Sequence, residues 1–199
     1  MLLFARPSAE RIHAFIESQR ASPFSYPAPG ATREEALPGY QADRYRVQLG
    51  SGAEVYARAL HALLAWKMFD TGWLYVWLPG TPIEAGRTVA VLARHYGFWS
   101  LNACRIVYAF DEREPGLRCG FAYGTLSDHA EGGEERFKVE MRAADQSVWY
   151  EIFALSRPRG WVRAAYPLAR RLQRRFGRDS LDAMRRAVGA SPNELPVAR

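Results

Sequence analysis

Six apolar segments follow one another between residues 73 and 156, and this succession constrains the fold of the chain more than any other feature. Turn-forming residues separate the segments, which cover residues 73–78, 87–95, 102–111, 118–126, 134–142 and 148–156. Runs of this length and spacing predict an antiparallel meander. In the fifth segment, Phe137, Val139 and Met141 alternate with charged residues, so this strand should have one dry face and one wet face.

The turn between the last two segments predicts how these two strands pair. A tight turn around Asp145 would place Met141 opposite Tyr150 and would keep apolar side chains together on the inner face. The same pairing brings Arg142 against Trp149 on the outer face, where the guanidinium and the indole can form a cation–π contact.

The chain before the meander predicts two helices and a strand, joined by an irregular segment. Residues 8–20 carry apolar side chains at helical spacing after a serine N-cap. Residues 22–38 contain four prolines and a glycine, which predicts a wrapping loop rather than regular structure. Residues 44–49 alternate as a strand does. Residues 53–69 lack Pro and Gly and repeat apolar side chains at helical spacing, which predicts one long and largely buried helix.

Two further helices are expected at the C-terminal end. Residues 160–176 carry an apolar stripe surrounded by arginines, and residues 180–188 predict a second short helix that ends at Gly189. A curved antiparallel sheet cannot cover its own concave apolar face, so the longer terminal helix must lie across it. The expected fold class is therefore α+β, with a curved antiparallel sheet of about seven strands gripping a long C-terminal helix.

Length and composition indicate the class of protein. A chain of 199 residues fits one domain, with an N-terminal helix and Pro-rich loop in residues 1–40, a core in residues 44–178 and a C-terminal extension in residues 179–199. Hydrophobic residues at 48% and charged residues at 24% are typical of soluble globular proteins. The two cysteines make no disulfide framework, and we recognise no signal peptide or membrane-spanning run, so a cytoplasmic location is expected.

Positive charge is concentrated near the C-terminal end. Residues 157–186 contain ten arginines and two aspartates, whereas the rest of the chain is slightly acidic. The aromatic residues of this region lie on the expected buried stripe, where they cannot stack on bases, so no nucleic-acid partner is expected. A weak contact between the arginines and an anionic membrane is the alternative use of this charge.

Four short motifs lie on or beside the expected strands. They are C-R-I-V-Y at residues 104–108, G-F-A-Y-G-T-L at residues 120–126, H-A-E-G-G-E-E-R-F at residues 129–137 and S-R-P at residues 156–158. With these motifs, the chain resembles a conserved bacterial and plant family classed as a domain of unknown function, over roughly residues 20–185. The order of its elements also resembles the START-like, or Bet v 1-like, helix-grip superfamily. Both resemblances imply the fold, and neither implies a reaction.

The third motif gathers the most unusual polar side chains, among them His129, Glu134 and Glu135. Strand parity places Glu135 on the inner face, toward the mouth of a cavity, where an unpaired carboxylate would be costly. One interpretation makes Glu135 an acid–base or ligand-orienting group, assisted by His129, Arg105 or Tyr123. The other is a turn in which Glu135 and His129 satisfy backbone amides or an arginine. Arg105 is expected to pair with Glu134 or Glu135.

The aromatic residues could wall a cavity between sheet and helix, or they could fill a solid core. We expect a small hydrophobic or amphipathic ligand as partner. The candidate ligand-binding residues are Trp66, Arg105, Tyr123, His129, Glu134, Glu135, Phe137 and Tyr150. No H-E-x-x-H, C-x-x-C or serine-elbow motif is present, so neither a metal nor a cofactor is expected. The alternatives are a cyclase- or hydratase-type enzyme using Glu135 and His129, and a peripheral membrane protein.

Overall fold

The structure is a computed structural model that describes residues 1–77, 82–114, 116–129, 131–159 and 166–189. Its strands are β1 (Leu2–Leu3), β2 (Gln41–Ser51), β3 (Leu74–Trp77), β4 (Thr88–His95), β5 (Phe98–Glu112), β6 (Leu117–Thr125), β7 (Glu131–Met141) and β8 (Ser147–Pro158). Its helices are α1 (Ala9–Gln19), α2 (Ala31–Glu34), α3 (Ala53–Leu64), the 3-10 helix η1 (Lys67–Phe69) and α4 (Tyr166–Val188). The six segments of the expected meander correspond to β3 through β8, which confirms their prediction.

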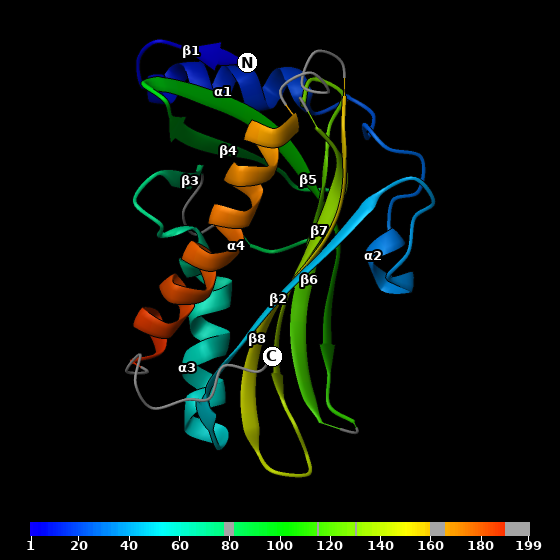
Figure 1. The fold of residues 1–199 in the computed structure, drawn as a ribbon, viewed down its shortest axis with the longest axis vertical. Coiled ribbons are helices and arrows are strands. Elements are labelled where there is room, and N and C mark those ends of the chain that lie inside the picture. Colours follow the sequence, from blue (N-terminus) through cyan, green and yellow to red (C-terminus); the bar gives the residue numbers. More distant parts are fainter. Residues whose placement is uncertain (78–81, 115, 130, 160–165, 190–199) are drawn as a thin grey trace.

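The described strands form an antiparallel sheet that curves around the helices. Its order is β2-β8-β7-β6-β5-β4-β3, and the short β1 pairs with β5. From β3 to β8 each strand lies beside the next in sequence, whereas β2 crosses over to pair with β8. The helical segments α3, η1 and α4 cover the concave face, and α2 lies on the convex side (Figure 1). The fold is α+β with the helix-grip arrangement, as the sequence predicts.

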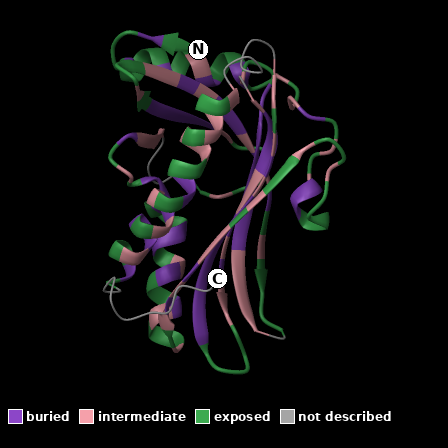
Figure 2. Cartoon of the chain, viewed as in Figure 1, coloured by how far each residue is buried: buried purple, intermediate pink, exposed green. Residues whose placement is uncertain are grey.

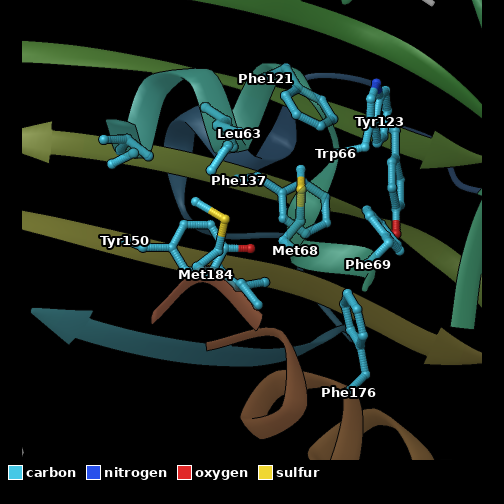
Figure 3. Packing of buried hydrophobic residues seen from close by; sticks show 14 of the residues in the cluster. Leu63, Trp66, Met68, Phe69, Phe121, Tyr123, Phe137, Tyr150, Phe176 and Met184 are labelled. Atoms are coloured by element: carbon cyan, nitrogen blue, oxygen red, sulfur yellow. The ribbon is translucent and has the colours of Figure 1, made fainter. Parts of the chain in front are cut away.

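Aromatic and aliphatic side chains fill the space between the sheet and α3, η1 and the C-terminal half of α4 (Figure 3). Phe121, Phe137 and Tyr150 rise from the strands, and Leu63 and Met184 meet them from the helices; all five are fully buried. Buried residues are concentrated in the middle strands of the sheet and on the sides of α3 and α4 that meet it (Figure 2). Full burial of a large apolar side chain contributes roughly 1.5–3 kcal/mol. We call this packed region, built around these five residues, the filled half.

The pairing of β7 with β8 differs from the expected register by two residues. Met141 pairs with Val148 rather than with Tyr150. The cause is the turn, which is centred one residue earlier than expected: Gln146, at φ 55°, donates its backbone N–H to the carbonyl of Arg142 over 2.9 Å. A shift of two residues keeps every side chain on its expected face, so the assignment of inner and outer residues is unaffected.

The outer face of β7 is polar, as the alternation predicts, whereas β8 turns Trp149, Phe153 and Leu155 outward, and the last two pack on Ala31 of α2. Trp149 lies there beneath two arginines, with the Arg142 guanidinium carbon 5.0 Å and the Arg46 guanidinium carbon 4.5 Å from the ring centroid. The expected contact between Arg142 and Trp149 is therefore confirmed despite the shifted register. Nearby, the buried carboxylate of Glu151 forms ion pairs with arginine and lysine side chains.

The helix expected over residues 53–69 is interrupted. Directly after α3, Trp66 adopts φ 58°, and η1 then continues the chain. This left-handed conformation is rare for a bulky residue. It turns the chain so that the Trp66 ring packs on Phe121, with ring centroids 4.7 Å apart, and Phe69 stacks on Phe176 at 5.3 Å. The prediction of one continuous helix was wrong because tertiary packing overrides the local helical pattern.

The two helices expected at the C-terminal end are a single helix in the structure. α4 runs without a break through Gly177 and ends before Gly189, whose φ is 78°. Gly177 serves close packing, because a Cβ at this position would lie 2.5 Å from Cζ of Tyr45. The buried face of α4 continues past residue 178, so the core includes part of the expected extension. Residues 160–165 of the expected helix lie outside the described residues.

Candidate ligand-binding cleft

A cleft of about 700 Å³ opens between the sheet and the N-terminal half of α4. It continues the filled half along the same strands, at the end where the inward side chains are small. Ala154 and Ser156 of β8 and Cys104 of β5 line it. Phe69 and Phe176 also line it and belong to the packed core as well, so they form the wall between the two regions. We call the region lined by these five residues the hollow half.

The walls of the cleft are largely apolar. They include Tyr45 from β2, Trp73 just before β3 and Leu172 from α4. The indole N–H of Trp73 donates to Oδ2 of Asp179 over 2.7 Å, which fixes the orientation of this ring. Apolar walls that carry a few placed polar groups are typical of small-molecule binding sites.

Glu135 faces the cleft from the inner side of β7, as strand parity predicts. Tyr123 lies opposite it on β6 and donates its hydroxyl to Oε2 over 2.7 Å. Burial raises the pKa of Glu135 to about 7, with further increases from the negative charges of Glu131 and Asp43, against the lowering effect of the Tyr123 hydrogen bond. Protein surrounds this side chain, yet the cleft leaves it partly accessible to water. The carboxyl group therefore changes charge near neutral pH.

A hydrogen-bonded network ties α4 to β2 and β7 along one side of the cleft. Arg170 donates to both carboxylate oxygens of Asp43, with 2.7 Å between Nη2 and Oδ1. Gln173, one turn further along, accepts from Arg170 over 2.7 Å and donates to Oε2 of Glu131 over 2.9 Å. Burial raises the pKa of Glu131. The network holds α4 to the sheet where side chains leave the interlayer space unfilled.

His129 lies at the cleft and accepts a hydrogen bond from the backbone. Its Nδ1 receives the N–H of Glu131 over 3.0 Å, so the ring carries its proton on Nε2. Burial and the nearby positive amino terminus lower the pKa of His129 to about 4. This geometry agrees with the interpretation in which His129 satisfies a backbone amide in a turn. It does not pair with Glu135.

Glu134 turns its carboxylate to the convex face, away from its neighbour Glu135. There it accepts from the hydroxyl of Tyr26 over 2.6 Å and from the N–H groups of Gly30 and Thr32 over 2.6 Å and 3.0 Å, and also from the Thr32 hydroxyl. All three partners belong to the Pro-rich segment 22–38, which wraps the outer side of the sheet as expected. The expectation that this segment has no regular structure was wrong at residues 31–34, which form the short helix α2. Glu134 is therefore an anchor for this segment.

Arg105 also lies outside the cleft, and the expected ion pair with Glu134 or Glu135 is absent from the described part of the chain. Its Nη2 donates instead to the carbonyls of Gln19 over 2.9 Å and of Arg20 over 2.7 Å, at the C-terminal end of α1. Carbonyl groups at a helix C-terminus carry partial negative charge. The prediction was wrong because a helix end distant in sequence supplies the acceptors.

Three aromatic candidates, Trp66, Phe137 and Tyr150, lie in the filled half rather than along the cleft. Their rings make the solid core that was the alternative interpretation of these residues. Tyr123 and Glu135 are the candidates whose side chains meet at the cleft. The structure therefore separates the eight candidates into cleft, core and outer-face groups, which strand parity alone could not do for residues on the same face.

Several residues of the cleft were not among the sequence-based candidates. The alternation over residues 44–49 already turns Tyr45 inward, and the same parity extended by two residues reaches Asp43. The apolar stripe of the terminal helix likewise contains Phe176. Gln173 had no such signal, because a glutamine on an arginine-rich helix looks like an ordinary surface residue.

The polar groups that line the cleft are carboxyl, hydroxyl, amide, imidazole and guanidinium groups. Within the described ranges, no set of three or more His, Cys, Asp and Glu side chains is placed to hold a metal ion. None of the helices in the described part of the chain combines the length and apolar character needed to cross a membrane. The thiols of Cys104 and Cys119 are free, and burial raises the pKa of each.

Comparison with known proteins gives one family and a set of distant structural neighbours. Residues 25–183 match the model of a family described as a domain of unknown function (DUF1990). A UPF0548 protein of Dictyostelium discoideum is 37% identical over 212 residues, which cover 97% of this chain and 98% of the relative. A UPF0548 protein of Deinococcus radiodurans is 34% identical, covering 95% of this chain and 100% of the relative. The solved structure of Ara h 8.0201 is 12% identical, with a TM-score of 0.45, covering 77% of this chain and 100% of that chain.

Proposed function

The chain belongs to the DUF1990 family of domains of unknown function, and we propose that it binds a small hydrophobic or amphipathic ligand, non-covalently, in the hollow half. The observation that carries this proposal is the cleft of about 700 Å³ beneath α4. Small-molecule sites typically have volumes of roughly 300–1,000 Å³ and apolar walls with a few polar groups. The cleft matches this description in both respects.

The packing on either side of the cleft supports the same proposal. Protein interiors are normally close-packed, and side chains that border an unfilled volume lose dispersion contacts. A ligand with an apolar body would supply these contacts to Phe69, Leu172 and Phe176. Its polar end would meet the hydrogen-bonded pair of Tyr123 and Glu135.

Ala154 and Ala109 provide a matched pair of substitutions that tests the proposal. Ala154 lies on the floor of the cleft, whereas Ala109 is exposed on β5. We expect Nile red, a neutral apolar dye, to bind the natural protein and Ala109→Phe equally. Ala154→Phe should weaken binding by at least about tenfold, because the added ring occupies the cleft. Fluorescence titration measures both affinities.

Native mass spectrometry of freshly purified protein provides the second measurement. We expect a co-purifying small molecule on the natural protein and on Ala109→Phe, and its loss from Ala154→Phe. Equal Nile red affinity for the two variants, together with no bound mass in any sample, would contradict the proposal.

Proton transfer by Glu135 is a second candidate function, favoured by its pKa of about 7. General acid–base catalysis is most effective when the pKa of the group lies near the working pH, as a cyclase or hydratase requires. His129 could assist only through Nε2, because Nδ1 accepts the backbone N–H of Glu131. A ligand extracted from the protein and returned to it in D₂O should gain deuterium with the natural protein and not with Glu135→Gln. Identical exchange with both would exclude this role for Glu135.

A weak contact with anionic membranes is a third candidate, favoured by the outer face of α4. Arg171, Arg174 and Arg178 are exposed there and form no ion pair with the described residues. Basic side chains near an anionic lipid surface each contribute about 1 kcal/mol. We expect flotation with vesicles containing phosphatidylserine and none with pure phosphatidylcholine, and the triple Arg→Gln variant should lose flotation. Binding that is indifferent to anionic lipid would refute this candidate.

A further inference from the structure

Glu131 and Glu135 line the cleft and form no ion pair with a described residue. Glu135 accepts a hydrogen bond from the phenol of Tyr123, and Glu131 accepts one from the amide of Gln173. Both donors are neutral. In contrast, Asp43 on the neighbouring side of the cleft is fully engaged by a guanidinium group. Negative charge on Glu135 is therefore uncompensated in a largely apolar site, which is costly, whereas the positive charge of Arg170 partly offsets that of Glu131.

The surroundings of Glu135 leave room for an incoming group. Glu131 and Glu135 lie on the same face of β7, roughly 13 Å apart along the strand. Gly133 stands between them and has no side chain. Across the ladder on β8, Glu135 faces Ala154 and Gly133 faces Ser156, both of them small. Among the described residues, Oε1 of Glu135 receives no hydrogen bond, so one carboxylate oxygen is available at the cleft.

Aromatic rings surround the same end of the cleft. Phe69 lies against Tyr123, with ring centroids 6.2 Å apart, and against Phe176 at 5.3 Å. Tyr45 lines the cleft as well, and burial raises its pKa, with smaller increases from the negative charges of Asp43 and Glu135. The faces of aromatic rings carry negative electrostatic potential and attract organic cations. Carboxyl groups and aromatic faces therefore both favour a positively charged ligand.

We propose that the ligand of the hollow half is an amphipathic amine, with its ammonium group bound by Glu135 and its apolar body between the aromatic walls and α4. This inference rests on the proposed binding function and names the class of ligand. An anionic ligand such as a fatty acid would add a further negative charge beside Glu131 and Glu135. A neutral ligand would remove water from both carboxyl groups and offer no charge in return. An ammonium group forms a charge-assisted hydrogen bond while the apolar body fills the volume.

The arginine that lines the cleft does not change this balance. Arg159 donates through Nη1 to the carbonyl of Ser127 over 3.0 Å, and it forms no ion pair with Glu131 or Glu135 in the described structure. The amino terminus of Met1 also lies at the cleft, where it donates to the carbonyl of Leu101 over 2.9 Å. Glu135 accepts no hydrogen bond from either cation in the described structure, so its carboxyl group remains available to an incoming ammonium group.

Three probes with the same ten-carbon chain test the inference: decylamine, 1-decanol and decanoate, each titrated by calorimetry below its micelle concentration. On the natural protein we expect decylamine to bind at least about tenfold more tightly than 1-decanol, as one charge-assisted hydrogen bond predicts. Decanoate should bind most weakly. Glu135→Gln should reduce the preference for decylamine over 1-decanol to less than about threefold.

Two further variants make the assignment specific. Glu54→Gln removes one negative charge at a side chain that is 89% exposed on α3, so it should leave the preference for decylamine intact. Glu131→Gln should lower the preference by a smaller factor than Glu135→Gln, because Glu131 already shares the amide of Gln173. Circular dichroism spectra that match those of the natural protein confirm that each variant is folded.

The outcomes separate the inference from the binding proposal beneath it. If 1-decanol or decanoate binds the natural protein as tightly as decylamine, the amine class is overturned and the binding function stands. If the preference for decylamine survives in Glu135→Gln, the assignment of the ammonium group to Glu135 is overturned. If none of the three probes binds, both the amine class and the binding function fail.

Discussion

The filled half and the hollow half lie side by side on the same strands and beneath the same helix, yet one is solid core and the other is a cleft. Along β8, the inward side chains change from Tyr150 and Ile152 to Ala154 and Ser156. The backbone continues in the same direction, so the concave face is divided by the change in side-chain size, together with α3 and η1, which pack over the filled half. Large side chains there stabilise the fold, and small ones leave room for a ligand.

Removing a large side chain from the filled half should have the largest effect on stability. Phe137 is fully buried, with its ring centroid 5.2 Å from that of Phe121 and 5.3 Å from that of Tyr123. We expect Phe137→Ala to lower the free energy of unfolding by about 3–5 kcal/mol. Phe98, 42% exposed, serves as the control. If urea denaturation gave equal losses in the free energy of unfolding for Phe137→Ala and Phe98→Ala, the description of the filled half as a packed core would be contradicted.

Substitution on the convex side of the sheet, behind the hollow half, should have the next largest effect on stability. Glu134 sits behind the cleft and accepts four hydrogen bonds from the Pro-rich segment. Glu134→Gln turns an amide NH₂ toward donors, so we expect a loss of about 2–3 kcal/mol in the free energy of unfolding. The same substitution at Glu135 should cause no such loss. Urea denaturation of both variants at neutral pH would show whether the strand carries one anchor or two.

A pH series sharpens the comparison at Glu135 itself. Burial raises its pKa from 4.5 to about 7, so between these values the folded protein binds more protons than the unfolded chain. The contribution of Glu135 to stability is therefore complete below about pH 4.5 and declines as the pH rises to about 7. Glu135→Gln lacks this decline. At about pH 8 its free energy of unfolding should exceed that of the natural protein by about 1–2 kcal/mol, because water in the cleft reduces the cost of the charged carboxylate.

Thermal unfolding at about pH 4.5 and about pH 8 measures the two differences. The natural protein and Glu135→Gln should be equally stable at the lower pH. A natural protein that gains stability over the variant as the pH rises would reverse the sign and show that the folded state favours the charged carboxylate.

Filling the hollow half should have the smallest effect on stability. The ring added by Ala154→Phe enters an existing volume, so the cost of overpacking is avoided, and we expect a change of less than about 1 kcal/mol in the free energy of unfolding. Ligand binding should nevertheless be lost. A destabilisation as large as that of Phe137→Ala in the same urea experiment would mean that this region is packed like the core.

The sequence alone predicts which residues share a face, because side-chain parity and helical spacing are local properties. Phe137, Val139 and Glu135 face inward on β7 as the alternation requires, and the curved sheet with its gripping helix follows from the order of the segments. The register shift around Gln146 arises from one left-handed turn residue, which the alternation does not encode. Because the shift is an even number of residues, the prediction of faces survives it.

The division between core and cleft, and the partners of the polar groups, depend on contacts between distant segments. The arginine expected to meet Glu134 or Glu135 binds carbonyls of α1 instead, and Trp66 leaves the helical conformation to reach the aromatic cluster. Gly177 lies inside a helix, and its lack of a side chain makes room for the Tyr45 ring. Each of these outcomes depends on a neighbour that no local pattern identifies.

The anchor at Glu134 has a consequence for how such proteins can diverge. The carboxylate fixes the backbone of β7 from the convex side, independently of what lies in the cleft. Mutations that enlarge, reduce or recharge the floor at Ala154, Ser156 or Glu135 therefore act on a strand whose position is already secured. Relatives with the same scaffold can acquire new ligand preferences by exchanging a few side chains, and the mutational path between two preferences does not have to pass through an unfolded intermediate.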